Sequence, residues 1–201
     1  MIRVKICGIT NLEDGLLASG FGAYALGFIF FKRSKRYIEP KKAKMIIEKL
    51  PAFILKVGVF VDEEEKHILE IFRYCALDRV QLHDDNEREF KHIPPSKIIK
   101  AFRVREKADI ERAESSKYFP LLDSYSEKAY GGTGESFDWN LLKEIKRDYI
   151  LAGGINLTNI DSILKINPYA IDLSSGVEKE PGIKDKKKMF EFFNYLRQNQ
   201  K

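Results

Sequence analysis

Residues 148–176, DYILAGGINLTNIDSILKINPYAIDLSSG, predict one unit of strand, helix and strand. Two apolar runs of strand length, at 148–154 and 169–175, flank a segment that reads as a helix, and Asn156 is a residue type that favours a helix start. Strands that alternate with helices are typical of a parallel sheet, because a parallel connection must cross from one end of the sheet to the other. The stretch therefore predicts a parallel α/β fold.

The same alternation continues along the whole chain. Eight apolar runs lie at 2–7, 23–30, 54–61, 78–83, 96–104, 118–124, 148–154 and 169–175. Helical signals separate most of them, for example Thr10 and Asn11 before the second run. Eight units match a closed (βα)8 TIM barrel better than an open flavodoxin-like sheet, which would leave three runs unexplained. With about 25 residues in each unit the loops must be short, so we expect a small, single-domain TIM barrel over residues 1–201.

The composition is ordinary for a soluble globular protein. Hydrophobic residues make up 44% of the chain and charged residues 32%, which excludes a disordered or collagen-like chain. No apolar run is long enough for a signal sequence or a membrane span, so we expect a cytoplasmic protein. In that compartment Cys7 and Cys75 are expected as reduced thiols and not as a disulfide.

Charges of both signs are mixed along the sequence. The 35 basic and 30 acidic residues give a net charge of +5, which is weak evidence for nucleic acid and is compatible with a small anionic substrate. The densest basic run is KDKKK at 184–188, which we interpret as the solvated start of the last helix and not as a phosphate-binding patch. We therefore expect no nucleic acid and no membrane among the partners.

The ends of the predicted strands are the most informative positions, because TIM barrels carry their catalytic groups there. These ends are Cys7, Phe30, Val61, His83, Arg103, Asp123, the pair Gly153 and Gly154, and residues 172–176. The last two ends supply glycines, serines and the starts of the helices that follow. Free backbone N–H groups and a positive helix end favour a phosphate, so we expect these two loops to bind one.

Two strand ends carry groups that are suited to proton transfer. Asp123 closes an apolar strand, where a carboxylate is costly unless it is solvated, paired or used. Cys7 closes the first strand, and spacing alone favours its interpretation as a small buried hydrophobic residue. An acid and a thiol that converge on a phosphate-binding mouth nevertheless suggest proton transfer on a phosphorylated substrate.

Other residues leave their roles open. Arg36 lies among several cations and is either solvated or suited to bidentate recognition of a carboxylate. The glycine-rich segment 130–139 is weak evidence, because flexible connectors have the same composition. His67, His83 and His92 lack the spacing of a metal site, so we expect no metal. His83 is expected to make a less important polar contact at the cavity mouth.

Seven short motifs follow one another along the chain. They are KICGIT at 5–10, SKRYI at 34–38, VGVFV at 57–61, VQLH at 80–83, GGTGESFDW at 131–139, LAGGIN at 151–156 and DLSSGVEKEPGIKD at 172–185. Together they resemble the phosphoribosylanthranilate isomerase family of tryptophan biosynthesis, and the resemblance runs nearly from end to end.

The resemblance implies a small β/α barrel that needs no metal or organic cofactor. It implies an Amadori rearrangement of N-(5-phosphoribosyl)anthranilate to the carboxyphenylamino deoxyribulose phosphate, with Cys7 as general base and Asp123 as general acid. Asp123 must then start protonated, so we expect a raised pKa. The expected substrate-binding residues are Arg36 for the anthranilate carboxylate, His83 at the mouth, and Gly153, Gly154, Asp172, Ser174, Ser175 and Gly176 at the phosphate end.

Three alternatives stay open at this point. Another phosphosugar barrel, such as indole-glycerol-phosphate synthase, would need catalytic lysines at its strand ends, whereas this sequence offers Cys7 and Asp123 there. A catalytically silent phosphosugar-binding protein has no need of either residue. An isomerase with a broader aminoaldose range typically uses paired aspartates in place of the cysteine. The partner expected is a small-molecule substrate, and a homodimer is possible.

Overall fold

The computed structural model of the chain describes residues 2–84, 88–123, 142 and 145–199. Its centre is a closed barrel of eight strands in sequence order, and each neighbouring pair is parallel. The strands are β1 (Arg3–Cys7), β2 (Ala25–Ile29), β3 (Leu55–Val61), β4 (Arg79–His83), β5 (Ile98–Arg103), β6 (Phe119–Asp123), β7 (Ile150–Ala152) and β8 (Ala170–Leu173). Each strand lies within one of the eight predicted runs, so the predicted TIM barrel is confirmed.

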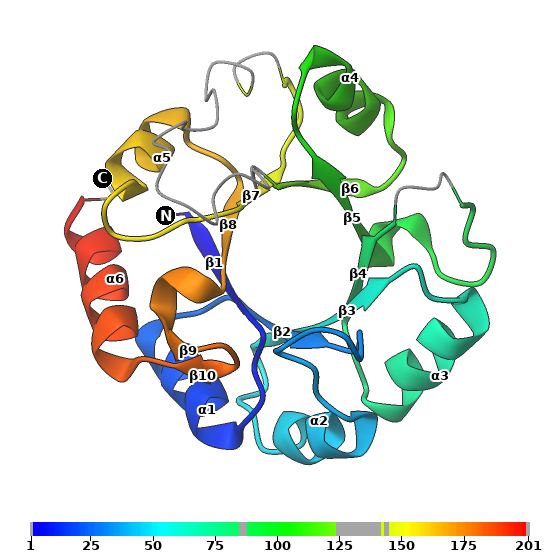
Figure 1. Cartoon of the computed structure of the whole chain (residues 1–201), viewed down its shortest axis with the longest axis horizontal. Coiled ribbons are helices and arrows are strands. Elements are labelled where there is room, and N and C mark those ends of the chain that lie inside the picture. Colours follow the sequence, from blue (N-terminus) through cyan, green and yellow to red (C-terminus); the bar gives the residue numbers. More distant parts are fainter. Residues whose placement is uncertain (1, 85–87, 124–141, 143–144, 200–201) are drawn as a thin grey trace.

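The helices surround this ring of strands on its outside (Figure 1). In the described part of the chain the α-helices are α1 (Leu12–Phe21), α2 (Pro40–Ile47), α3 (Glu65–Tyr74), α4 (Lys107–Ser115), α5 (Ile160–Ile166) and α6 (Lys186–Asn199). Short elements complete the fold: the 3-10 turns η1 (Pro95–Lys97) and η4 (Ser175–Val177), and a hairpin of β9 (Glu178–Glu180) and β10 (Ile183–Lys184). No helix among the described residues combines the length and the apolar composition that a membrane span requires.

Alternate residues of each strand face opposite sides of the barrel wall. Outward side chains such as Ile6 and Phe28 pack in one large apolar cluster with helix residues such as Ile68. A second, smaller cluster lies inside the barrel and consists of Ala25, Val57, Ile99, Leu121, Ile150, Ala152 and Ala170. Cys7, His83 and Asp123, which are suited to proton transfer or hydrogen bonding, stand at the C-terminal strand ends, which places the candidate site at that end.

The opposite, N-terminal end of the barrel carries mainly apolar and aromatic side chains, together with the cations Arg3, Lys5 and Arg79. The Arg3 guanidinium lies over the rings of Tyr24 and Tyr169, 5.7 and 4.1 Å from their centroids. A cavity of about 220 Å³ opens here and is lined mainly by apolar residues, among them Leu55 and Phe119. Phe53, just before β3, is 100% exposed at the same end.

Two helix starts illustrate how local sequence sets these elements. Asn11 precedes α1, and its side chain accepts a hydrogen bond from the backbone N–H of Asp14, as predicted for a helix cap. The prediction that Asn156 caps the next-to-last helix is wrong, because α5 begins only at Ile160, after Asn159. The Asn156 side chain instead accepts hydrogen bonds from Thr158 within the preceding turn.

Candidate active site

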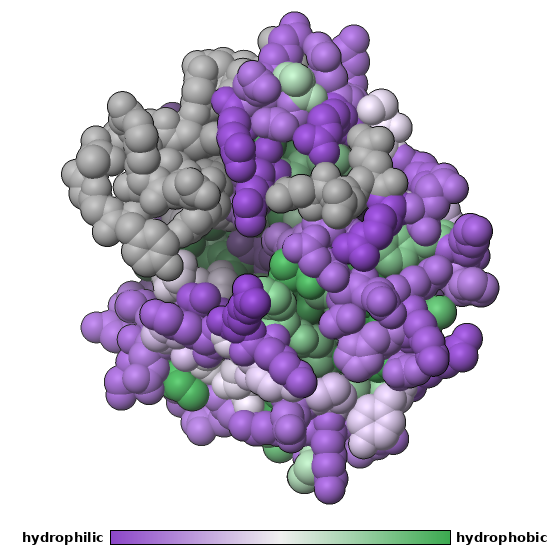
Figure 2. Space-filling model, turned by 45° about the vertical axis from the view of Figure 1, so that its right-hand side comes forward, coloured by the Kyte–Doolittle hydropathy of each residue, from purple (hydrophilic) through white to green (hydrophobic). Residues whose placement is uncertain are grey.

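A cavity of about 500 Å³ lies at the C-terminal ends of the strands. Figure 2 shows a hollow in this side of the molecule, with hydrophobic surface inside it and hydrophilic residues around it. Nine of the ten predicted site residues line the cavity: Cys7, Arg36, His83, Asp123, Gly153, Gly154, Asp172, Ser174 and Ser175. The tenth, Gly176, lies in η4 beside them, where a Cβ would clash with the carbonyl oxygen of Ile155.

Cys7 lies at the end of β1 and is 7% exposed. Burial raises the pKa of its thiol, since a thiolate is poorly solvated there. The cations of Lys5 and Lys184 oppose this effect, whereas the carboxylate of Asp172 adds to it. The resting thiol is therefore protonated, and a nearby cation is what makes its thiolate accessible.

A buried ion pair lies directly below this thiol in the barrel. The Lys5 ammonium is 2.7 Å from Oδ2 of Asp172, and both side chains are less than a tenth exposed. Burial opposes the charge on Lys5, but Asp172 and Cys7 outweigh it and raise the pKa of Lys5. Lys5 thus carries a positive charge between the Cys7 thiol and a buried carboxylate.

Asp123 ends β6 and lines the same cavity as Cys7. In the strand ladders it is level with Arg103 of β5 and Ala152 of β7. Its side chain is half-buried at the rim, and the expected raised pKa of this carboxyl stays a prediction. Because both side chains open into one cavity, a single bound molecule can contact Asp123 and Cys7 together.

Gln81 and His83 form another inward pair, on β4. Their Nε2 atoms are 2.8 Å apart, and because an amide nitrogen can only donate, the imidazole accepts at Nε2 and carries its proton on Nδ1. Burial lowers the pKa of His83 to about 4, and nearby cations add to this effect. At neutral pH His83 is therefore an uncharged hydrogen-bond partner and not a cation.

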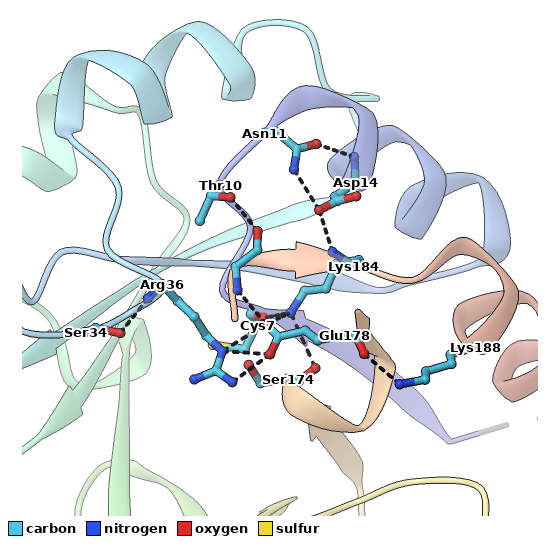
Figure 3. A network of polar contacts seen from close by, with 11 residues as sticks. Cys7, Thr10, Asn11, Asp14, Ser34, Arg36, Ser174, Glu178, Lys184 and Lys188 are labelled. Atoms are coloured by element: carbon cyan, nitrogen blue, oxygen red, sulfur yellow. Dashed lines mark hydrogen bonds and ion pairs between the residues drawn. The ribbon is translucent and has the colours of Figure 1, made fainter. Parts of the chain in front are cut away.

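Arg36 is held in place by an acid from the β9–β10 hairpin (Figure 3). Its Nη2 and Nε atoms donate to the carboxylate of Glu178 at 2.6 and 2.9 Å. The same carboxylate accepts a 2.8 Å hydrogen bond from Lys184, whose ammonium also donates to the carbonyl oxygen of Cys7 at 2.5 Å. Burial raises the pKa of Glu178, but the hydrogen bonds from these two cations outweigh it and lower the pKa overall. Arg36 is thus oriented before any substrate arrives.

The predicted phosphate end is built from loops. Gly153 and Gly154 follow β7 with positive φ of 97° and 60°, which places successive backbone groups along the cavity wall. The hydroxyl of Ser174, after β8, is buried without a hydrogen-bond partner in the described chain, and such a group needs one. The helix expected to start at Asn156, two residues after Gly154, begins only at Ile160. After β8 the chain forms only the short 3-10 turn η4 before the β9–β10 hairpin.

The sequence prediction missed four polar residues of this site, namely Lys5, Gln81, Glu178 and Lys184. Lys5 and Gln81 stand two positions before Cys7 and His83, and the two-residue period of a strand could have placed both inside the barrel. Lys184 corrects the interpretation of the run 184–188 as solvated, because its side chain is fully buried against Glu178. No local pattern distinguishes Lys184 from the lysines after it. The predicted glycine-rich segment 130–139 lies outside the described residues.

The described residues contain no group of three His, Cys, Asp or Glu side chains that could hold a metal ion. The groups that do meet in the cavity are an acid, a thiol with cations beside it, an oriented guanidinium and glycine- and serine-rich loops. These can move protons and bind anions. The fold and this cavity define a (βα)8-barrel protein with its site at the C-terminal ends of the strands.

Comparisons with known proteins resolve this class further. Residues 4–195 match the family model of N-(5'phosphoribosyl)anthranilate (PRA) isomerase, so the chain belongs to that family. An N-(5'-phosphoribosyl)anthranilate isomerase of Geobacter metallireducens is 46% identical over 199 residues, which cover 96% of this chain and 97% of that protein. One of Thermotoga petrophila is 44% identical over 191 residues, covering 92% and 93%.

Solved structures give the same result. The crystal structure of phosphoribosyl anthranilate isomerase from Thermotoga maritima superposes with a TM-score of 0.86 at 41% identity, covering 98% of this chain and all of that one. A structure of the isomerase in complex with reduced 1-(o-carboxyphenylamino)-1-deoxyribulose 5-phosphate has a TM-score of 0.83 at 39% identity, covering 98% and 100%.

Proposed function

We propose that the chain, acting as one domain over residues 1–201, isomerises N-(5-phosphoribosyl)anthranilate to 1-(2-carboxyphenylamino)-1-deoxyribulose 5-phosphate in L-tryptophan biosynthesis. The observation that carries this proposal is the meeting of Cys7 and Asp123 in one cavity. Family membership and the relatives named for this activity support it. We expect the enzyme to work in the cytoplasm.

Asp123 acts first, as the general acid. It donates a proton to the ring oxygen of the ribose while the bond from that oxygen to C1 breaks. The lone pair of the anthranilate nitrogen forms a double bond to C1, which gives an open-chain Schiff base. A proton on the leaving oxygen is required, because an alkoxide is a poor leaving group. The position of Asp123 at the rim supports this role, since the ribose must lie between the phosphate loops and the cavity mouth.

Cys7 acts second, as the general base. The iminium group makes the neighbouring C2 proton acidic, and the Cys7 thiolate takes it. The C–H electrons form a C1–C2 double bond and neutralise the iminium nitrogen. The resulting enolamine gains a proton at C1 and loses the proton of its hydroxyl, which gives the ketone. Burial of Cys7 deep in the cavity supports this assignment, because water is kept from the reactive intermediate.

The remaining residues bind the two anionic ends of the substrate. Arg36, oriented by Glu178, takes the anthranilate carboxylate, and His83 donates a neutral hydrogen bond. The loops with Gly153, Gly154, Ser174, Ser175 and Gly176 take the phosphate. The buried hydroxyl of Ser174 supports this, because a phosphate oxygen supplies the partner it lacks in the described chain. Asp172 faces Lys5 and orients the end of β8, so it does not meet the dianion.

Turnover of freshly made phosphoribosylanthranilate tests the proposal. The fluorescence of the anthranilate group changes as the substrate is consumed, and the wild type is expected to consume it to completion without an added cofactor. A protein that binds the phosphorylated product but leaves the substrate unchanged would instead be a silent phosphosugar-binding barrel. That result would contradict the proposed enzyme function but leave the fold assignment unchanged.

We also propose that the enzyme is a homodimer through the N-terminal end of its barrel. An exposed phenylalanine, Phe53, and an apolar cavity lie at this end. In a twofold interface the same surface of both copies must be self-complementary. Phe53 can protrude from one copy into the apolar cavity of the other. A structure of the Thermotoga maritima enzyme is described as that of monomers made from a dimeric isomerase, which supports a second copy as the occupant.

A further inference from the structure

Lys5 is a buried lysine of the barrel interior to which the reaction steps above assign no part. We propose that Lys5 is the counter-cation of the Cys7 thiolate, and that Asp172 keeps Lys5 charged and in place. The proposal rests on the proposed function, because it concerns the base of that reaction. It makes Lys5 a positioning residue that acts through Cys7.

The geometry brings the two side chains together from one strand. Lys5 and Cys7 are two residues apart on β1, so both face the interior. The Lys5 ammonium donates to Oδ2 of Asp172 at 2.7 Å, and the Cys7 thiol lies close enough to it that the ammonium lowers the pKa of the thiol. An ammonium between a thiol and a carboxylate can hold a negative charge on either of them.

Gly27 leaves the room that this arrangement needs. It lies level with Cys7 on the neighbouring strand β2. A Cβ at this position would stand 2.7 Å from the Cys7 sulfur and 3.1 Å from the Lys5 nitrogen. Any side chain would therefore push the thiol and the ammonium away from their present positions.

The other charges around the Cys7 sulfur do not replace Lys5. They come from Asp172 of β8, Lys184 of β10, Arg36 after β2, Asp123 of β6, and Glu178 behind Arg36 and Lys184, with neutral His83 on β4. Lys184 donates to the backbone carbonyl of Cys7 and is paired with Glu178, so its charge is largely compensated. Among the described cations, Lys5 lowers the pKa of the Cys7 thiol most.

The pH dependence of Cys7 alkylation by iodoacetamide tests this role, because only the thiolate reacts. Peptide mass spectrometry separates Cys7 from Cys75, and Cys75, which is 1% exposed, reports any general unfolding. In Lys5→Met the pKa of Cys7 is expected to rise by at least about one unit, so the alkylation rate below that pKa falls about tenfold. kcat should fall with little change in KM, since Lys5 does not touch the substrate.

Two further variants keep the test decisive. Lys5→Met leaves Asp172 buried without its partner, so the same comparison is repeated between Asp172→Asn and the double variant Lys5→Met/Asp172→Asn, which buries no unpaired charge. Lys56→Met is the matched control, because Lys56 also pairs with an aspartate, Asp78, at 2.8 Å but away from the cavity. It should leave the alkylation profile of Cys7 unchanged.

The outcomes separate this proposal from the proposed function. A rise in the Cys7 pKa on removal of Lys5 in both backgrounds supports it. An unchanged alkylation profile in both backgrounds overturns it, even if the wild type is an active isomerase. The alkylation assay uses no substrate. An inactive wild type would therefore contradict the proposed function, while the pH dependence of Cys7 alkylation would still test the role of Lys5.

Discussion

The two ends of the barrel interior are built on the same eight strands and differ in what their inward positions carry. The C-terminal end holds Cys7, Asp123 and the Lys5–Asp172 ion pair, and most of these groups are buried. The N-terminal end holds mainly apolar and aromatic side chains, with Arg3 and Arg79 among them. The difference lies in these side chains and in the loops that follow the C-terminal end of each strand. In the described part of the chain, the groups suited to proton transfer are confined to the C-terminal layer, whereas the N-terminal layer stabilises the barrel and, we propose, joins two copies.

The largest effect is expected from the proposed acid and base at the C-terminal end. Cys7→Ser and Asp123→Asn should each lower kcat by at least about two orders of magnitude, because general acid–base catalysis contributes that much. The measurement is the fluorescence assay at one pH. Cys75→Ser, a buried thiol elsewhere, and Asp62→Asn, an exposed carboxylate just after β3, are the controls. Activity within a few-fold of wild type in either active-site variant would remove that residue from the mechanism.

A charge at the N-terminal end should affect assembly and leave catalysis alone. Phe53→Glu is expected to raise the dissociation constant of the dimer at least about 30-fold, since burial of a phenylalanine side chain contributes about 2 kcal/mol. Sedimentation at several concentrations measures this constant. Phe190→Glu, in a phenylalanine of α6 that is 47% exposed, is the matched control. A wild type that sediments as a monomer throughout would contradict the dimer.

His83 should make the stability of the C-terminal end depend on pH. Its pKa is about 4 in the folded protein, below its ordinary value of 6.5. Between these values the unfolded chain binds a proton that the folded chain does not, so stability falls as the pH drops. From pH 7 to pH 5 this loss is about 2 kcal/mol.

Urea denaturation at both pH values measures that loss. His83→Gln should reduce it by about the same 2 kcal/mol, whereas His67→Gln, on the exposed face of α3, should leave it unchanged. Equal pH dependence in the wild type and in His83→Gln would show that His83 is not held in its neutral form.

The smallest effect concerns the orientation of Arg36. Glu178→Gln keeps a side chain of the same shape but removes the charge that holds the guanidinium. We expect KM to rise about tenfold, or about 1.4 kcal/mol, with a smaller change in kcat. Glu180→Gln, on the exposed part of the same hairpin, is the control. A change confined to kcat would place Glu178 in the chemical steps instead of in binding.

The fold was predictable because the strands carry a strong local signal. All eight apolar runs became strands, and their ends supplied eight of the residues that line the cavity. The start of α5 was not predictable from Asn156, since asparagine also stabilises turns, and here Asn159 is the residue that precedes the helix.

The partners within the site were harder to predict. Lys184 stands in a run of basic residues that looks solvated, and only the β9–β10 hairpin folds it against Glu178 and the end of β1. The pairing of Lys5 with Asp172 joins residues 167 positions apart, which no local pattern encodes. Spacing identified which residues face the interior, but the pairs that set their charges depend on the closed barrel.

The most direct test of the separate roles of Cys7 and Asp123 uses substrate that carries deuterium at C2 of the ribose. Turnover of this substrate and of the unlabelled one is compared in the wild type, Cys7→Ser and Asp123→Asn. The account predicts a large primary isotope effect in Cys7→Ser, where removal of the C2 proton limits the rate, and almost none in Asp123→Asn, where ring opening limits it. Equal isotope effects in the two variants would contradict the assignment of the acid and the base to separate steps.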